Sequence, residues 1–166
     1  MKLSAKTIII TIILSVILLI VGFYSWNYFF MATLPIVGDV KYQADNMTAP
    51  FRQSLLFALT LALIPISSIL IWRFAPVLAA QKKILTIGII LIAIILSVAT
   101  RREMIKYQAR HLQPTTILDY SDPTTPQPKT IESLIPISTV NFELFALAGL
   151  ITGSIISFFL LRQKTK

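Results

Sequence analysis

The sequence predicts an all-α integral membrane protein, an antiparallel bundle of four transmembrane helices that forms a single domain over residues 1–166. Of the 166 residues, 55% are apolar and only 13% are charged, which is about half the charged share of ordinary soluble domains. The charges are also clustered, so that four long intervals of the chain carry none. A soluble chain of this size could not bury so much apolar surface, and we therefore expect a membrane location.

The four uncharged intervals lie near or above the length of about 17–25 residues that a membrane-spanning helix needs. They predict helices at 6–30, 53–74, 84–101 and 142–161. The first interval follows Lys2 and Lys6 as a secretory signal would, but its apolar run is too long and no A-x-A-like cleavage site follows. We expect this helix to be retained.

The third helix is expected to extend beyond the membrane. No helix breaker occurs between Thr100 and His111, most residues there are good helix formers, and Pro114 is the expected stop. Residues 102–140 then form an outer helix extension followed by a Pro/Thr-rich loop, for which we expect extended or irregular backbone. Residues 31–52 form a shorter outer loop.

The distribution of charge predicts that both termini are cytoplasmic. With four spans, the termini and the second loop share one side and carry eight Lys and Arg residues in short segments, against seven in the two longer loops of the other side. All seven acids fall on that other side, so the first side carries the whole net charge of +8. Cation density and the two lysines before the first helix favour the inner face of a plasma membrane. The expected partner of this face is anionic lipid headgroups rather than nucleic acid.

A basic stripe is expected on the outer extension, where Arg102, Lys106 and Arg110 recur at every fourth residue. Like charges at this spacing repel one another by a few tenths of a kcal/mol, so a counter-charge is expected nearby. Glu103, the acids of the following loop, a partner protein and anionic headgroups are all candidates.

The fourth helix carries a line of small residues, Gly149, Gly153 and Ser157. Small residues at this spacing allow helix backbones to approach closely in lipid, so the line is expected to be a packing face. It could meet helix one, helix two or a second copy of the chain, whereas Leu150 is expected to face lipid. In helix two, Pro65 is expected to produce a kink in which Ser67 or Ser68 satisfies the freed carbonyl.

One group of polar residues is expected to gather at the outer ends of the helices: Asn27, Arg52, Arg101, Arg102, Asn141 and Glu143. Glu143 lies about one turn inside the membrane boundary and should therefore need a partner, which Arg52 or Arg101 could supply. The cluster is then either a structural ion pair that fixes helix ends or a polar mouth that binds a ligand from outside.

The sequence contains no motif for catalysis, for a cofactor or for a metal site, and it has no cysteines. It therefore favours a non-enzymatic accessory, assembly or oligomeric subunit, with helix four as the possible oligomer contact. The alternatives are a small transporter or channel component, or a membrane enzyme that acts on a lipid or hydrophobic substrate at the outer face with Glu143 or a loop acid as base. The layout resembles small four-span families in outline, and "DNMTAPF" resembles a loop of anthrone-oxygenase-like proteins, but the cysteines of claudins and vitamin K epoxide reductases are absent.

Overall fold

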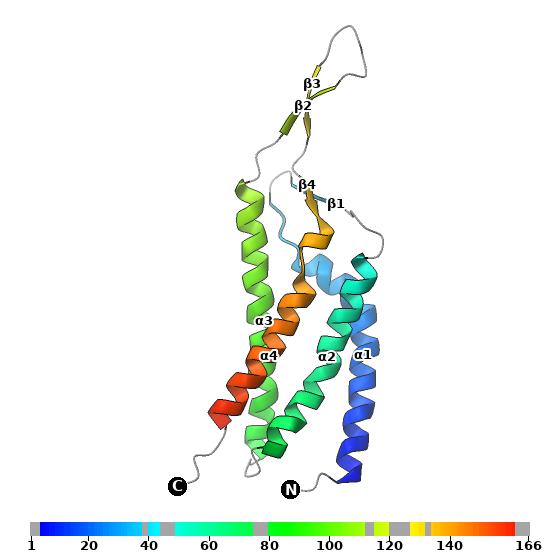
Figure 1. The fold of residues 1–166 in the computed structure, drawn as a ribbon, viewed down its shortest axis with the longest axis vertical. Coiled ribbons are helices and arrows are strands. Elements are labelled where there is room, and N and C mark those ends of the chain that lie inside the picture. Colours follow the sequence, from blue (N-terminus) through cyan, green and yellow to red (C-terminus); the bar gives the residue numbers. More distant parts are fainter. Residues whose placement is uncertain are drawn as a thin grey trace.

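Four long helices dominate the structure (Figure 1). The computed structural model describes residues 4–37, 40–43, 49–74, 80–111, 115–119, 127–131 and 134–161. The helices are α1 (Ala5–Thr33), α2 (Ala49–Phe74), α3 (Ala80–His111) and α4 (Phe142–Leu161). Each is long and apolar enough to cross a membrane, as expected for the four predicted helices.

The helix ends agree with the prediction to within a few residues, apart from α2 and α3, which each begin four residues early. The extension of α3 to His111 is confirmed. Because the charged residues between Arg101 and Arg110 favour helix as much as the apolar run before them, α3 continues without a break.

The end of the molecule that carries the strands, opposite the start of α1 and the end of α4 (Figure 1), is called the outer end. Its strands are paired, which was not predicted. Strand β1 (Lys41–Gln43) pairs in parallel with β4 (Leu134–Pro136), and β2 (Thr115–Asp119) pairs antiparallel with β3 (Gln127–Ile131). Prolines are tolerated because each sheet has two strands, both of which are edges, and β-branched Thr and Ile residues favour extended backbone. Of the two alternatives expected for residues 102–140, the strands β2, β3 and β4 have extended rather than irregular backbone. Strands β2 and β3 project at the end of the molecule opposite both termini (Figure 1).

The helices lie side by side in the order α1, α2, α4, α3 (Figure 1), and the main contacts join α1 to α2, α2 to α4 and α4 to α3. At the outer end, aromatic rings tie three helices together. The rings of Phe29 and Phe57 stack at 4.5 Å, and Phe30 meets Phe142 edge-on at 5.9 Å. This cluster aligns the start of α4 with the outer ends of α1 and α2.

The small-residue line of α4 packs on α3. A Cβ atom added at Gly149 would lie 2.6 Å from the Ile94 Cα, and one added at Gly153 would lie 2.9 Å from the Ile90 Cα. The hydroxyl of Ser157 is buried and donates to the Thr86 carbonyl at 3.4 Å. The line of small residues therefore lies against α3, which was not among the expected partners.

Two smaller expectations were wrong. Leu150 is buried rather than lipid-facing, because α4 has α3 on one side and α2 on another. In α2, the hydroxyls of Ser67 and Ser68 both donate to the Ile64 carbonyl, at 3.0 and 2.8 Å. The carbonyl that Pro65 deprives of its helical donor belongs to the residue four positions earlier, so these serines do not repair it.

A second close approach was missed from the sequence. A Cβ atom added at Gly22 of α1 would lie 2.8 Å from the Ala58 Cα of α2. The sequence indicated only the α2 side of this contact, because Ala58 and Ala62 form a weaker pair at small-residue spacing, whereas Gly22 has no such partner on its own helix.

Glycine substitutions in α3 and α4 should have opposite effects. Gly149→Ala forces a methyl group against the α3 backbone and should destabilise the protein by about 1–3 kcal/mol. Gly88→Ala is the matched control, because a Cβ atom there meets nothing within 4 Å, and the gain in helix propensity should leave it neutral or slightly more stable. Thermal unfolding in mild detergent measures both, and equal shifts would contradict the packing of α4 on α3.

Candidate functional site

The candidate site is built around the connection that leads into α4 at its outer end. The 3-10 turn η1 (Ile137–Thr139) follows β4, and Val140 and Asn141 then lead into the helix. Asn141 has a φ of 53°, a left-handed conformation that asparagine tolerates better than most residues. Its carbonyl accepts from the amides of Leu144 and Phe145, so this sharp turn sets the first residue of α4.

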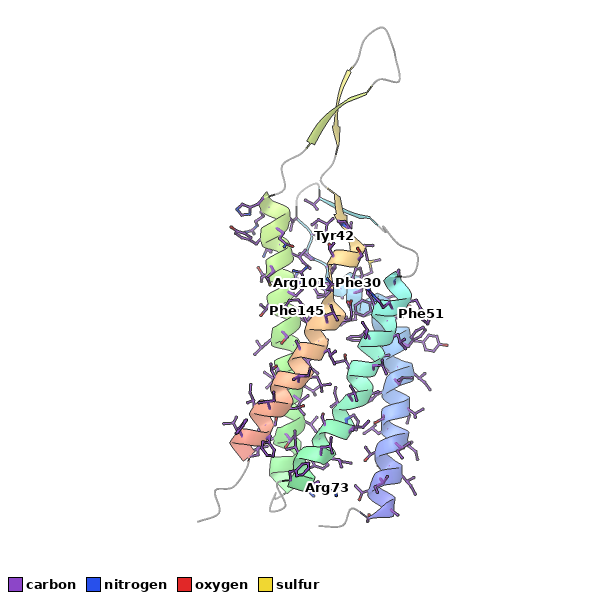
Figure 2. All side chains as sticks on the ribbon, in the orientation of Figure 1. Phe30, Tyr42, Phe51, Arg73, Arg101 and Phe145 are labelled. Carbon is purple, nitrogen blue, oxygen red and sulfur yellow. The ribbon has the colours of Figure 1, made fainter. Side chains whose placement is uncertain are left out.

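Arg101 of α3 holds this connection through two backbone carbonyls. Its Nε donates to the Val140 carbonyl at 2.9 Å and its Nη2 donates to the Thr139 carbonyl at 2.6 Å. The guanidinium also lies 5.5 Å from the ring centroid of Phe145, and both residues are labelled in Figure 2. A planar, forked donor suits two neighbouring acceptors, and bonds from a charged donor are stronger than neutral ones.

Gln53 of α2 holds the same connection from the other side, and sequence reasoning missed it. This side chain is almost completely buried, and its amide nitrogen donates to the Ile137 carbonyl at 3.2 Å. The position of this neutral amide in the first turns of an apolar helix could have indicated the contact, because a buried polar group needs a hydrogen-bond partner. Arg101 and Gln53 together attach the connection to both α3 and α2.

Glu143, in the first turn of α4, is fully buried. Neither carboxylate oxygen has a hydrogen-bond partner among the residues that the structure describes. Helical periodicity puts Glu143 on the same side as Leu147 and Leu150, away from the Gly149 and Gly153 line. A buried carboxyl without a donor is costly, so it is the most unusual group in the described part of the chain.

The expected ion pair of Glu143 with Arg52 or Arg101 is not formed within the described residues. Arg101 donates instead to the backbone carbonyls of Thr139 and Val140, just before α4. Arg52 is solvent-exposed, although its positive charge acts on Glu143 through space. The ion pair was predicted because Glu143 and the two arginines lie at the same end of their helices. Backbone carbonyls, however, compete with the Glu143 carboxylate for the Arg101 guanidinium.

The remaining residues of the predicted cluster are only partly brought together. Asn141 shares the Thr139 carbonyl with Arg101, since its side-chain amide donates to it at 3.3 Å. Asn27 is exposed and lines a cavity next to Gln53. Arg102 is exposed on α3 and makes no described contact with the cluster.

The basic stripe consists of exposed Arg102 and Arg110 with half-buried Lys106 between them. Lys106 forms an ion pair at 3.5 Å with Glu103, which is one of the expected counter-charges. Both partners are substantially exposed, so the pair contributes little to stability. The acidic side chains of the following loop lie outside the described residues.

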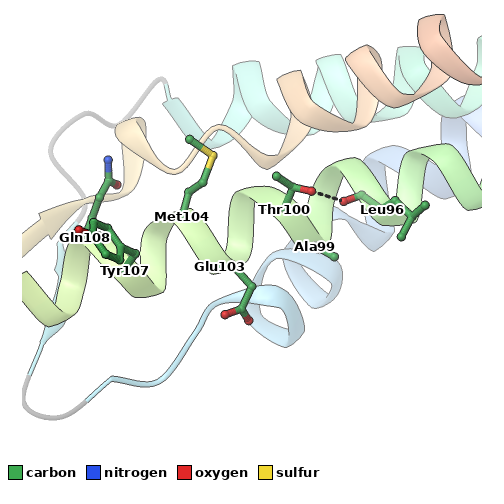
Figure 3. A pocket seen from close by; sticks show the side chains of 7 residues that line it. All are labelled: Leu96, Ala99, Thr100, Glu103, Met104, Tyr107 and Gln108. Atoms are coloured by element: carbon green, nitrogen blue, oxygen red, sulfur yellow. Dashed lines mark hydrogen bonds between the residues drawn. The ribbon is translucent and has the colours of Figure 1, made fainter.

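Two hollows lie near the outer end. One has a volume of about 410 Å³ and lies between α1, α2 and η1; its polar lining is Asn27, Gln53 and Ser54, and its apolar lining includes Trp26 and Phe30. The other is an open groove of about 730 Å³ along α3 (Figure 3), where Leu96, Ala99, Thr100, Glu103, Met104, Tyr107 and Gln108 line one helix face. Within the described residues, no group of three His, Asp or Glu side chains could hold a metal ion.

Replacing Arg101 with lysine should loosen the entry of α4. Lysine keeps the charge but lacks the fork that reaches two carbonyls, so Arg101→Lys should destabilise the protein by about 1–3 kcal/mol. Arg102→Lys is the matched control and should change stability by less than about 0.5 kcal/mol. Hydrogen exchange should speed up at the amides of Leu144 and Phe145 in the first variant alone; unchanged exchange there would argue against the role assigned to Arg101.

Comparisons with protein-family models, with curated proteins and with solved structures find no match for this chain. No relative therefore supplies a function for the site.

Proposed function

We propose that this chain is a plasma-membrane protein whose four helices cross the bilayer as one antiparallel bundle, with both termini in the cytoplasm. Four helices of sufficient length and apolarity support this. The two chain ends lie at one end of the molecule and the strands at the other (Figure 1). The net charge of +8 on the side of the termini suits the anionic headgroups of an inner leaflet, at roughly 1 kcal/mol per cation near the surface.

Within that membrane, we propose a non-enzymatic role as an accessory or assembly subunit that binds a partner protein at its outer end. One observation carries this proposal. Beyond Arg101, α3 has a buried face, with Ile105 and Ala109 in the same core cluster as Ile135. The opposite face exposes Met104 and Tyr107, by 46% and 66%. A helix that is packed on the core on one side, and that exposes large apolar side chains among charged and polar ones on the other, suits protein docking above the membrane.

The proposed partner contact is therefore on α3 rather than on helix four. The line Gly149, Gly153 and Ser157 is buried between α4 and α3, so a second chain could not use it without separating the two helices. An oligomer through helix four would need its exposed side, which carries larger residues such as Ile151 and Ile155.

A second candidate function is a component of a small transporter or channel. The observation in its favour is Glu143, a buried carboxyl without a described donor. Intramembrane ionisable groups are typical of ion and proton paths. The enzyme alternative has less support, because a general base is normally oriented by a hydrogen-bonded neighbour, and no such neighbour of Glu143 lies among the described residues.

The orientation can be tested with single cysteines, because the chain has none of its own. Ser4→Cys and Gln108→Cys put thiols at exposed positions near the two ends of the molecule. In intact cells, an impermeant thiol reagent should label position 108 and should label position 4 only after lysis. Labelling of position 4 in intact cells would reverse the proposed orientation.

The partner surface can be tested by photo-crosslinking in cells. A photoreactive phenylalanine at Tyr107 should give an adduct with a second polypeptide. The same residue at Tyr28, a still more exposed tyrosine at the outer end of α1, should give none and is the matched control. The proposed docking face fails if Tyr107 yields no protein adduct, or if both positions yield the same one.

A further inference from the structure

Glu143 must bind something that compensates for its burial. Of the glutamates whose side chains the structure describes, Glu103 is exposed and Glu143 is fully buried. An ionised carboxylate without a hydrogen bond or a paired charge costs several kcal/mol in apolar surroundings. The described residues offer its two oxygens no donor. A proton bound to the carboxyl removes the charge and most of this cost.

Three features oppose this effect and favour the ionised form. Glu143 lies in the first turn of a 20-residue helix, where the peptide dipoles stabilise negative charge. Its own backbone amide, although it forms no hydrogen bond of good geometry, and the positive charge of Arg52 also act on the carboxylate. Burial therefore favours a bound proton, and these three features favour its release.

The other charged and titratable groups around Glu143 do not cancel this effect. On α3, Arg101 is committed to the carbonyls of Thr139 and Val140. The titratable side chains at the outer end of α1 are the exposed phenols of Tyr24 and Tyr28. On β1, the hydroxyl of Tyr42 donates to the Pro35 carbonyl, and burial raises the pKa of this phenol. Arg52 is thus the one described cation near Glu143 with an uncommitted side chain.

A cavity of about 410 Å³ lies at the same end of the bundle as Glu143. It is lined by Gln53, the neighbour of Arg52 in sequence, and by Phe30. The Phe30 ring contacts Phe142, which precedes Glu143 in the chain. Glu143 itself does not line the cavity, but Asn27 and Gln53 give water in it polar groups to bond.

We propose that Glu143 is an exchangeable proton-binding site reached from the outer side, with Arg52 as the counter-charge that stabilises it once the proton has left. The inference does not depend on the docking face of α3. It adds a proton as ligand to a residue that the sequence assigned to a structural ion pair.

Dicyclohexylcarbodiimide, applied to membranes that contain the whole chain, tests the proposal. With a protonated carboxyl in an apolar site, the proton moves to a carbodiimide nitrogen and the carboxylate oxygen bonds to the central carbon. Migration of the acyl group to nitrogen then leaves a stable N-acylurea. Mass spectrometry should find this adduct on Glu143, and its yield should fall as the outer pH rises through the range in which the protein stays folded.

Two pairs of variants sharpen the test. Glu143→Gln should abolish the adduct, while Glu103→Gln should not affect it. Arg52→Gln removes the charge that favours proton release, so labelling should persist to higher pH, whereas Arg102→Gln should leave the pH profile unchanged. Infrared absorption of the protonated carboxyl, identified by its loss in Glu143→Gln, should follow the same profile.

Three results would overturn the proposal. Absence of both the adduct and the infrared band at every pH means that Glu143 is permanently ionised. Labelling and a band that do not change with pH mean that the proton does not exchange. Protection by sodium ions or an organic cation at constant pH, with no effect of pH itself, means that the carboxyl binds a cation instead.

Discussion

The two hydrogen bonds from Arg101 to the carbonyls of Thr139 and Val140 determine how the outer end of the molecule is arranged. These carbonyls precede the first turn of α4, and a charged forked donor from α3 attaches them to the neighbouring helix. Because Asn141 turns sharply just after them, the position and rotation of α4 follow from this attachment. That rotation directs Gly149 and Gly153 onto α3 and buries Glu143 on another side. The unpaired carboxyl is thus a consequence of Arg101 having been used elsewhere.

Below this end, close backbone contact holds the helices together. In lipid, apolar side chains gain little by leaving the bilayer for one another, so association depends on packing between surfaces that approach closely. Gly22 on Ala58 joins α1 to α2, and Gly149 with Gly153 joins α4 to α3. Helices α1 and α3 are the two outermost members of the row, because each packs mainly on one neighbour. Their other faces remain exposed, and the proposed partner contact lies on that of α3.

The sequence determined the spans well, because the spacing of charges limits where a helix can cross the membrane, and the extension of α3 followed from residues that all favour helix. It also identified Gly149, Gly153 and Ser157, whose spacing lies on one helix. It could not name their partner, since periodicity describes a face and not the neighbour that covers it. The role of Arg101 was missed for a related reason. Charge suggests a charged partner, whereas a backbone carbonyl leaves no trace in the sequence. Gln53, Gly22 and the strand pairs involve single residues or short segments, for which patterns carry little information.

A solid-state nuclear magnetic resonance measurement in lipid tests the attachment of α4 most directly. Thr139 and Val140 form the only Thr–Val pair in the chain, so carbonyl-labelled threonine with amide-labelled valine selects one carbonyl carbon. Dipolar recoupling to labelled arginine side chains should then report a guanidinium nitrogen in hydrogen-bond range of that carbonyl, as the 2.6 Å bond requires, and Arg101→Lys should abolish the effect. If the arginine nitrogens instead couple to the side-chain carboxyl carbon of Glu143, identified by its loss in Glu143→Gln, the two residues are an ion pair and the account is contradicted.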